Sequence, residues 1–219
     1  MRRIVKDVVP DFWCKYLRKH PGERYDDLDK TAEGQQIRMR VHDHMLQHQK
    51  MLCCYCCRSI DVNNVEASHN EHIKPRAAFP DCSMDYGNLV VSCTPKPGKR
   101  LTCGMAKGRK YDPSKFVSPL SENCESHFSY LMDGRIRGNT EQGTYTIECL
   151  NLNERTLVEA RKALYKNCCD LARYVGKKWV VSEYMQEKDG ILPSFVDMVT
   201  YFYNRGDFDS GIVNNDNAT

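Results

Sequence analysis

Four short segments decide the fold of this chain: CCYCC at residues 53–57, ASHNEHIKP at 67–75, NLVVSC at 88–93 and CGMAKG at 103–108. Cysteines stand at both ends of this series, and two histidines and a glutamate stand between them. Cysteine, histidine and carboxylate side chains are the usual protein ligands of zinc. The series therefore predicts a small metal-stabilised centre inside a longer chain.

The cysteines of the first segment form two overlapping Cys-x-x-Cys pairs. These pairs are Cys53 with Cys56 and Cys54 with Cys57. Either pair has the spacing with which two thiolates hold one zinc ion, and spacing cannot choose between them. Cys93 and Cys103, separated by a loop rich in Pro, Gly and Lys, are the nearest candidates for the second pair. We expect a structural zinc site at Cys53, Cys56, Cys93 and Cys103, with reduced core cysteines as the alternative.

The composition of the 219-residue chain is that of a soluble globular protein, with 41% hydrophobic and 28% charged residues. Its beginning, MRRIVKD, has a basic start but no apolar stretch of the signal-peptide kind, and no later run is long enough to span a bilayer. We therefore expect a cytoplasmic protein with no membrane contact. Thiols stay reduced in that compartment, so the twelve cysteines favour metal binding or burial over disulfides.

A block of positive charge lies beside the last two cysteines. Between residues 94 and 110 there is no acid, and six cations occur: Lys96, Lys99, Arg100, Lys107, Arg109 and Lys110. A solvated loop is one interpretation of this block. Nucleic-acid binding is the other, because cations that neutralise phosphates supply most of the non-specific affinity for nucleic acid.

The flanks of the centre read mainly as helices. Apolar periodicity and breakers predict helices at residues 10–20 and 25–51, a strand at 144–149, a helix capped by Asn153, and helical pieces at 180–184 and 195–203. Four regions follow: an N-terminal helical segment at 1–52, the metal-bearing core at 53–120, a mostly helical region at 121–209, and a polar, disordered tail at 210–219.

The motifs His-x-Glu-His-Ile-x-Pro, Asn-Leu-Val-Val-Ser-Cys and Cys-Gly-Met-Ala-Lys-Gly, after a Cys-x-Tyr-Cys, resemble those of the HNH endonucleases. The sequence is most similar to the Septu nuclease of anti-phage defence, often called PtuB, and to HNH proteins associated with retrons. This resemblance covers most of the chain, and it implies an α+β fold. In such a fold a ββα-metal centre with a structural zinc lies between N- and C-terminal α-helices.

The resemblance also implies roles for individual residues. His72 matches the general base, Glu71 the carboxylate that binds the catalytic Mg²⁺ or Mn²⁺, and Asn88 the residue that orients the base. One position departs from the family, because many HNH chains carry Asn or His as a metal ligand where this chain has Gly104. His69, Asp112 or water would then have to complete the catalytic metal site.

On these grounds we expect a metal-dependent endonuclease that hydrolyses phosphodiester bonds, with DNA favoured over RNA. The resemblance implies an effector of a bacterial anti-phage system that an ATPase partner controls, in some systems together with a retron reverse transcriptase and its DNA. The alternative is a zinc-stapled adaptor that binds nucleic acid or protein and does not cleave.

Overall fold

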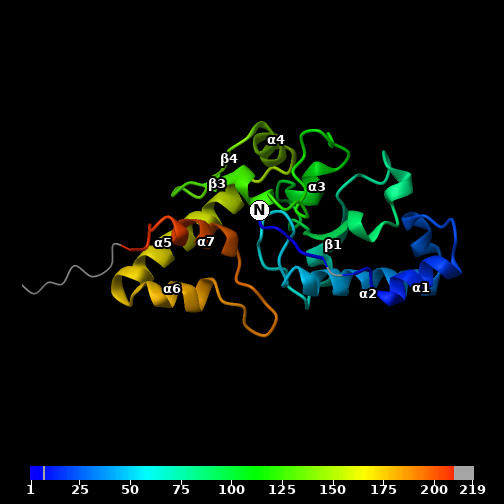
Figure 1. Ribbon diagram of the computed structural model, residues 1–219, viewed down its shortest axis with the longest axis horizontal. Coiled ribbons are helices and arrows are strands. Elements are labelled where there is room, and N and C mark those ends of the chain that lie inside the picture. The colour runs from blue at the N-terminus through cyan, green and yellow to red at the C-terminus, as the bar shows by residue number, and fades with distance from the viewer. Residues whose placement is uncertain (7, 210–219) are drawn as a thin grey trace, which may run out of the picture.

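The computed structural model describes residues 1–6 and 8–209, and its architecture is α+β, as predicted (Figure 1). The helices are α1 (Asp11–Lys19), α2 (Ala32–His48), α3 (Cys103–Lys107), α4 (Glu141–Cys149), α5 (Arg155–Tyr174), α6 (Lys177–Tyr184) and α7 (Val196–Asn204). The strands are β1 (Ser68–His72), β2 (Leu89–Cys93), β3 (Phe128–Tyr130) and β4 (Ile136–Gly138). The short 3-10 turns are η1 (Tyr25–Lys30), η2 (Val65–Ala67), η3 (Pro80–Cys82), η4 (Tyr86–Asn88) and η5 (Cys124–His127). The predicted disordered tail at 210–219 lies outside the described residues.

The helices α1 and α2 lie at one end of the molecule, α5 to α7 lie at the other, and the strands lie between them (Figure 1). The predicted first helix is confirmed as α1. The prediction of one helix over 25–51 is wrong, because the chain forms the turn η1 and then starts α2 at Ala32, after the N-cap Thr31. The Thr31 hydroxyl accepts a hydrogen bond from the Gly34 amide at 3.0 Å, which caps the new helix.

The first sheet is the antiparallel hairpin of β1 and β2, in which Glu71 lies opposite Val90 and His72 opposite Leu89. Helix α3 packs on β2, and α2 packs on the same strand. Successive side chains of a strand point to opposite faces of the sheet. His69 and Glu71 therefore share one face of β1, whereas Asn70 and His72 share the other.

The second sheet pairs β3 with β4, and α4 packs on β4. The strand predicted over 144–149 is wrong, since these residues are helical in α4. Their alternating Thr, Tyr and Ile residues suit a strand, but Thr140 caps a helix by accepting a hydrogen bond from the Gly143 amide at 3.0 Å. Tertiary packing of this helix on β4 overrides the local preference.

The C-terminal helices follow the predicted order, but the N-cap of α5 lies one residue later than predicted. Glu154 caps α5 through a bond from the Thr156 amide to its carboxylate, at 2.8 Å. The predicted cap, Asn153, instead donates to and accepts from the backbone of Ile136 and so ties the start of α5 to β4. Helices α6 and α7 confirm the two predicted helical pieces.

One continuous cluster of buried side chains reaches from Trp13 in α1 to Phe202 in α7. The buried α-amino group of Met1 joins this core, where it pairs with the Asp197 carboxylate at 2.8 Å and contacts the Tyr130 hydroxyl. Among the described residues, no helix combines the length and the apolar character that crossing a membrane requires.

Candidate metal centre and active site

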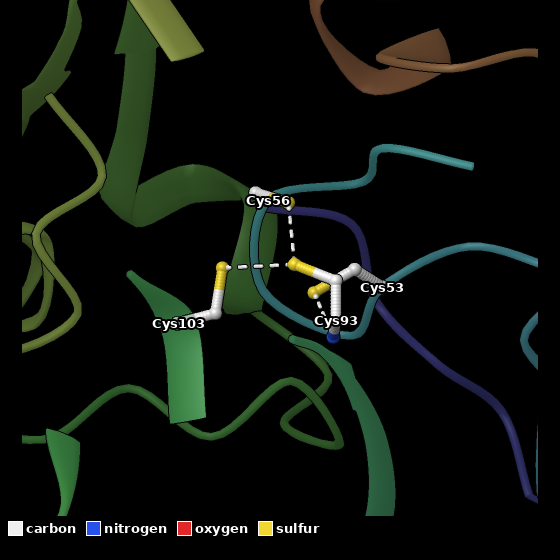
Figure 2. A group of neighbouring side chains, drawn as sticks. All are labelled: Cys53, Cys56, Cys93 and Cys103. Carbon is white, nitrogen blue, oxygen red and sulfur yellow. Dashed lines mark hydrogen bonds between the residues drawn. The ribbon is translucent and has the colours of Figure 1, made fainter. Parts of the chain in front are cut away.

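Four buried cysteine sulfurs gather between the residue 53–57 loop, the end of β2 and the start of α3 (Figure 2). The four are Cys53, Cys56, Cys93 and Cys103, and all their Sγ atoms lie within 4.8 Å of one another. The Cys56–Cys93 distance is 3.8 Å and the Cys93–Cys103 distance is 3.7 Å. A tetrahedron with zinc–sulfur bonds of about 2.3 Å has edges of about 3.8 Å. The geometry therefore fits a metal ion such as zinc and is too wide for a disulfide.

The structure selects Cys53 with Cys56 from the two overlapping pairs. The loop closes on itself, since the Cys57 amide donates to the Cys53 carbonyl at 3.1 Å, and this turn aims the first and fourth residues at one point. Cys57 points instead into a small apolar cluster that includes Leu52 and Leu192. Cys54 is buried in the main core, and its amide donates to the Val91 carbonyl of β2 at 3.0 Å.

The surroundings of the four sulfurs favour thiolates with a cation between them. The Cys93 amide donates to Cys53 Sγ at 3.3 Å, and the Arg58 guanidinium lies 4.0 Å from Cys93 Sγ. Without a cation, hydrogen bonding with Cys53 and the other thiols, together with burial, holds the pKa of Cys103 well above its usual value. A metal ion reverses this, because a coordinating thiol loses its proton.

Glu71 lies almost fully buried between β1 and α3. Its Oε1 contacts the Lys107 ammonium at 2.5 Å and the Tyr55 hydroxyl at 3.1 Å, whereas its Oε2 lies 3.5 Å from His69 Nε2. Burial acts to raise the pKa of Glu71, but the bond from His69 and the charge of Lys107 outweigh it and hold this pKa below its usual value. The carboxylate is therefore ionised and has one oxygen, Oε2, that faces only the imidazole among these partners.

His72 lies at the end of β1, on the other face, where it is 6% exposed. Its Nε2 lies 2.9 Å from the Ser83 carbonyl oxygen, and the Tyr25 ring packs edge-on against the imidazole. A carbonyl oxygen only accepts hydrogen bonds, so Nε2 carries the hydrogen and Nδ1 keeps a lone pair. Burial lowers the pKa of His72, which keeps the ring neutral near pH 7.

Asn88 clamps the loop that runs from β1 to β2. Its Oδ1 accepts from the Lys74 amide at 2.7 Å, and its Nδ2 donates to the carbonyls of Lys74 and Cys82, each at 3.0 Å. Cys82 precedes Ser83, whose carbonyl holds the His72 ring. The amide of Asn88 thus fixes the backbone that orients His72.

The six predicted phosphate contacts divide into two groups. Lys96, Lys99, Arg100, Arg109 and Lys110 are exposed on the loops before and after α3. Within the part of the chain that the structure describes, none of these five forms an ion pair. Lys107 is different, because its side chain is 1% exposed and its ammonium contacts Glu71 and the carbonyls of His72 and Ile73. This burial does not suit a phosphate contact, so we assign Lys107 to holding Glu71 and the end of β1.

Two residues of the centre escaped the sequence analysis. Tyr55 sits inside the cysteine loop and brings its hydroxyl to Glu71, and Thr94 lies 3.2 Å from His69 Nδ1 through its Oγ1. Tyr55 stands inside the Cys-x-Tyr-Cys motif, but only the cysteines of that motif signal a metal ligand, and Thr94 stands in no motif of the sequence analysis. Asp112, a predicted candidate ligand, accepts hydrogen bonds from Ser114 instead.

The fold and the cysteine cluster define an α+β protein that can hold a metal ion. No protein-family model matches the chain. A protein of Vibrio cholerae serotype O1 biovar El Tor, named "Retron Vc95 putative HNH endonuclease", is 34% identical over 155 residues, which cover 66% of this chain and 73% of that protein. An Escherichia coli protein, named "Retron Ec83 putative HNH endonuclease", is 23% identical over 137 residues, covering 61% of this chain and 48% of that protein.

The chain belongs to the family of retron-associated HNH endonucleases, because it shares a third of the aligned residues over most of the Vibrio protein. The predicted resemblance to this family is confirmed. The resemblance to the Septu nuclease stays a prediction.

Proposed function

We propose that this protein is a metal-dependent HNH endonuclease that hydrolyses phosphodiester bonds in nucleic acid, with DNA favoured over RNA. The observation that supports it best is His72, whose imidazole is held by the Ser83 carbonyl through Nε2 and leaves Nδ1 as a proton acceptor. A neutral, oriented imidazole is the side chain that general-base catalysis near pH 7 needs. The hairpin β1–β2 followed by α3 would then form the ββα-metal centre.

In the proposed reaction His72 Nδ1 takes a proton from water as the water oxygen attacks the phosphorus. The bond from phosphorus to the leaving ester oxygen breaks, and this oxygen is then protonated by solvent. The attacking and leaving oxygens lie on opposite sides of the phosphorus in such a displacement. This geometry suits β1, which directs His72 to one face and Glu71 to the other.

The donor set on the Glu71 face fits a divalent cation. Glu71 Oε2 and His69 Nε2 would hold Mg²⁺ or Mn²⁺, with water completing the shell. When bound, such an ion supplies stabilisation of the charge that develops on the phosphate and the leaving oxygen. The four cysteines would hold a separate, structural Zn²⁺.

The exposed cations beside α3 would bind the phosphate backbone on either side of the scissile bond. Because the names of both relatives place them with retrons, we further propose that this protein is the effector of a retron-type anti-phage system in the cytoplasm. In this proposal an ATPase partner controls when it cuts, together with a retron reverse transcriptase and its DNA.

The test is the variant His72→Ala, incubated with plasmid DNA and Mn²⁺ and compared with the native chain. We expect cleavage to fall by at least 10²-fold, the scale of general-base catalysis, while zinc content and the thermal unfolding temperature barely change. The matched control is His127→Ala, which removes a histidine next to β3, in the second sheet. Undiminished cleavage by His72→Ala would contradict the assignment of His72 as the general base.

The second candidate function is that of a zinc-stapled adaptor, which binds nucleic acid or protein without cleaving it. The burial of Glu71 and His72, which are 7% and 6% exposed, favours this function. A substrate must reach both groups for cleavage, but binding through the exposed cations needs neither. Incubation with plasmid and Mn²⁺, alone and with the proposed ATPase partner, separates the two functions. Retained DNA binding with no product under either condition would favour the adaptor.

A further inference from the structure

The space at the start of α3 has room for only one side chain besides Glu71. A Cβ atom added to Gly104 would lie 2.6 Å from Glu71 Oε2 and 2.8 Å from His69 Nε2, both closer than non-bonded contact permits. The Gly104 amide also donates to the Ser92 hydroxyl at 3.0 Å, so the helix start is anchored against β2 and cannot easily retreat. Gly104 is therefore required by the imidazole that already fills this space.

That imidazole comes from the strand. His69 and Glu71 are two residues apart on β1, so both side chains point towards α3. Thr94 Oγ1 lies 3.2 Å from His69 Nδ1, and a hydrogen bond there turns Nε2 towards the carboxylate. Lys107 and Tyr55 already occupy Oε1, so the atoms left for a cation are His69 Nε2 and Glu71 Oε2, which contact each other. A bound cation would replace this contact, with the ring hydrogen on Nδ1 directed at Thr94 Oγ1.

The separation of these two atoms suits a shared cation. Nitrogen and oxygen ligands bound at about 2.1–2.2 Å lie about 3.0–3.6 Å apart for bond angles between 90° and 110°. Nε2 and Oε2 are 3.5 Å apart. His69 is also the more exposed member, with 28% of its side chain accessible against 9% for Glu71, so an ion can enter from its side.

We propose that His69 and Gly104 form an exchangeable pair: one cation-binding side chain fills this space, supplied by β1 at position 69 in this chain, and glycine at 104 is the consequence. The inference rests on the proposed function, since it deepens the same divalent-cation site. It predicts that the ligand can be moved from the strand to the helix. The helix position can accept a side chain only when position 69 is vacated.

The experiment measures Mn²⁺ binding to the zinc-loaded full chain by titration calorimetry and pulsed EPR. In the native chain the Mn²⁺ spectrum is expected to carry coupling to a histidine ¹⁴N. His69→Ala should lose this coupling and weaken binding by at least 10- to 100-fold, the range found when even outer-shell partners of metal sites are changed. The double variant His69→Ala/Gly104→His should regain the coupling and most of the affinity.

Two controls test whether the effect is specific to this space. Gly104→His alone should bind Mn²⁺ less well than the native chain, because two imidazoles compete for one space. His127→Ala, which removes a histidine outside the site, should keep both affinity and ¹⁴N coupling. Zinc content and circular dichroism report whether each variant folds. If the double variant does not fold, His69→Ala alone is the test. Retained ¹⁴N coupling overturns the proposal, and lost coupling supports His69 as the side chain that fills this space.

The proposal is overturned if His69→Ala keeps native affinity and coupling, if the folded double variant is no better than the single one, or if the native chain binds no Mn²⁺. Plasmid cleavage is scored separately. Mn²⁺ binding that behaves as expected in a chain that never cuts would reject the proposed nuclease and leave the exchangeable pair standing. A native chain that cuts, while His69→Ala binds Mn²⁺ normally, would reject the exchangeable pair and leave the proposed nuclease standing.

Discussion

The described residues 8–209 contain two ββα units in succession, β1–β2–α3 and β3–β4–α4, and they are held together in different ways. Each consists of a two-stranded antiparallel hairpin with a helix packed on its second strand. An isolated two-stranded hairpin is at best marginally stable in water, so each unit needs support. The first has four cysteines arranged for a metal ion, and the second has none of them.

The groups that lie between hairpin and helix differ in the two units, and this explains the different support. Between hairpin and helix the first unit holds an ion pair, Glu71 with Lys107, and the imidazole of His69. In the second unit the backbones touch, because a Cβ on Gly143 would meet the His127 carbonyl at 2.2 Å and one on Gly138 the Thr144 amide nitrogen at 2.3 Å. Strand β2 is buried in the main core in the first unit, but polar groups separate its hairpin from its helix. A metal ion held by the four cysteines would link the two and stabilise this unit.

The largest expected effect comes from removing the proposed zinc ligand Cys103. We expect Cys103→Ala to lose the zinc ion, whose binding can contribute on the order of 10 kcal/mol, a magnitude comparable to the whole stability of a domain. The amides of β1 and β2 should then lose protection in hydrogen exchange, while those of β3 and β4 keep theirs. Elemental analysis counts the zinc, and exchange followed by mass spectrometry locates the loss.

The matched control is Cys54→Ala, which changes a buried cysteine of the same loop outside the cluster. It should keep one zinc per chain and cost about 1 kcal/mol. A folded Cys103→Ala protein that still holds zinc, or equal loss of protection in both hairpins, would remove the contrast between the units.

The next effect comes from the ion pair of Glu71 and Lys107. Lys107→Met leaves a buried carboxylate without its partner, which should lower the free energy of unfolding by roughly 3–5 kcal/mol. The double variant Glu71→Gln/Lys107→Met should recover part of this loss. Glu141 of the second unit forms an exposed pair with Lys115 of the preceding segment, 3.5 Å apart. This pair should matter little, and Lys115→Met should cost under about 1 kcal/mol.

Urea unfolding at fixed zinc concentration measures all three variants. The burial argument fails if Lys107→Met and Lys115→Met cost the same, or if removing both partners is as damaging as removing Lys107 alone.

Replacing one glycine in each unit should give smaller losses, which differ between stability and Mn²⁺ affinity. Gly143→Ala sets a methyl group against a backbone carbonyl, so we expect a loss of roughly 1–3 kcal/mol with Mn²⁺ affinity intact. Gly104→Ala sets it against the ends of two side chains, which can shift, so stability should fall less and Mn²⁺ affinity more. Thermal unfolding and titration calorimetry on both variants give the comparison. The same ranking of the two variants in both measurements would contradict it.

Much of the first unit could be predicted because its chemistry leaves a sequence signature. Cysteine spacing marks the cluster, and the motif at 67–75 marks Glu71 and His72. The expected set of Cys53, Cys56, Cys93 and Cys103 is the one that gathers. Spacing alone does not separate Cys53 and Cys56 from the overlapping pair, since the choice depends on how the loop closes on the end of β2. The burial of Lys107 was hidden for a similar reason: a lysine among exposed cations gives no sign that its ammonium meets Glu71.

The second unit has no such signature, and there the local pattern predicts the wrong structure. Residues 144–149 alternate as a strand would, but they form α4. What decides their structure is non-local: close approach at Gly138 to the backbone of Thr144, and at Gly143 to the His127 carbonyl. Thr140 adds a helix cap that a period-two pattern conceals.

The smallest effect on folding concerns the cations that flank the first unit alone. Lys99→Glu/Arg100→Glu changes exposed loop residues, so the free energy of unfolding should move by about 0.5 kcal/mol or less per site. DNA affinity should nevertheless fall, and each lost phosphate contact should reduce the slope of log affinity against log salt by about one. Fluorescence anisotropy at several salt concentrations measures both quantities. Lys162→Glu/Lys166→Glu on α5 carries the same change of net charge away from the first unit. If both double variants weaken DNA binding equally, net charge governs binding, and the cations beside the first unit are not a specific DNA-binding site.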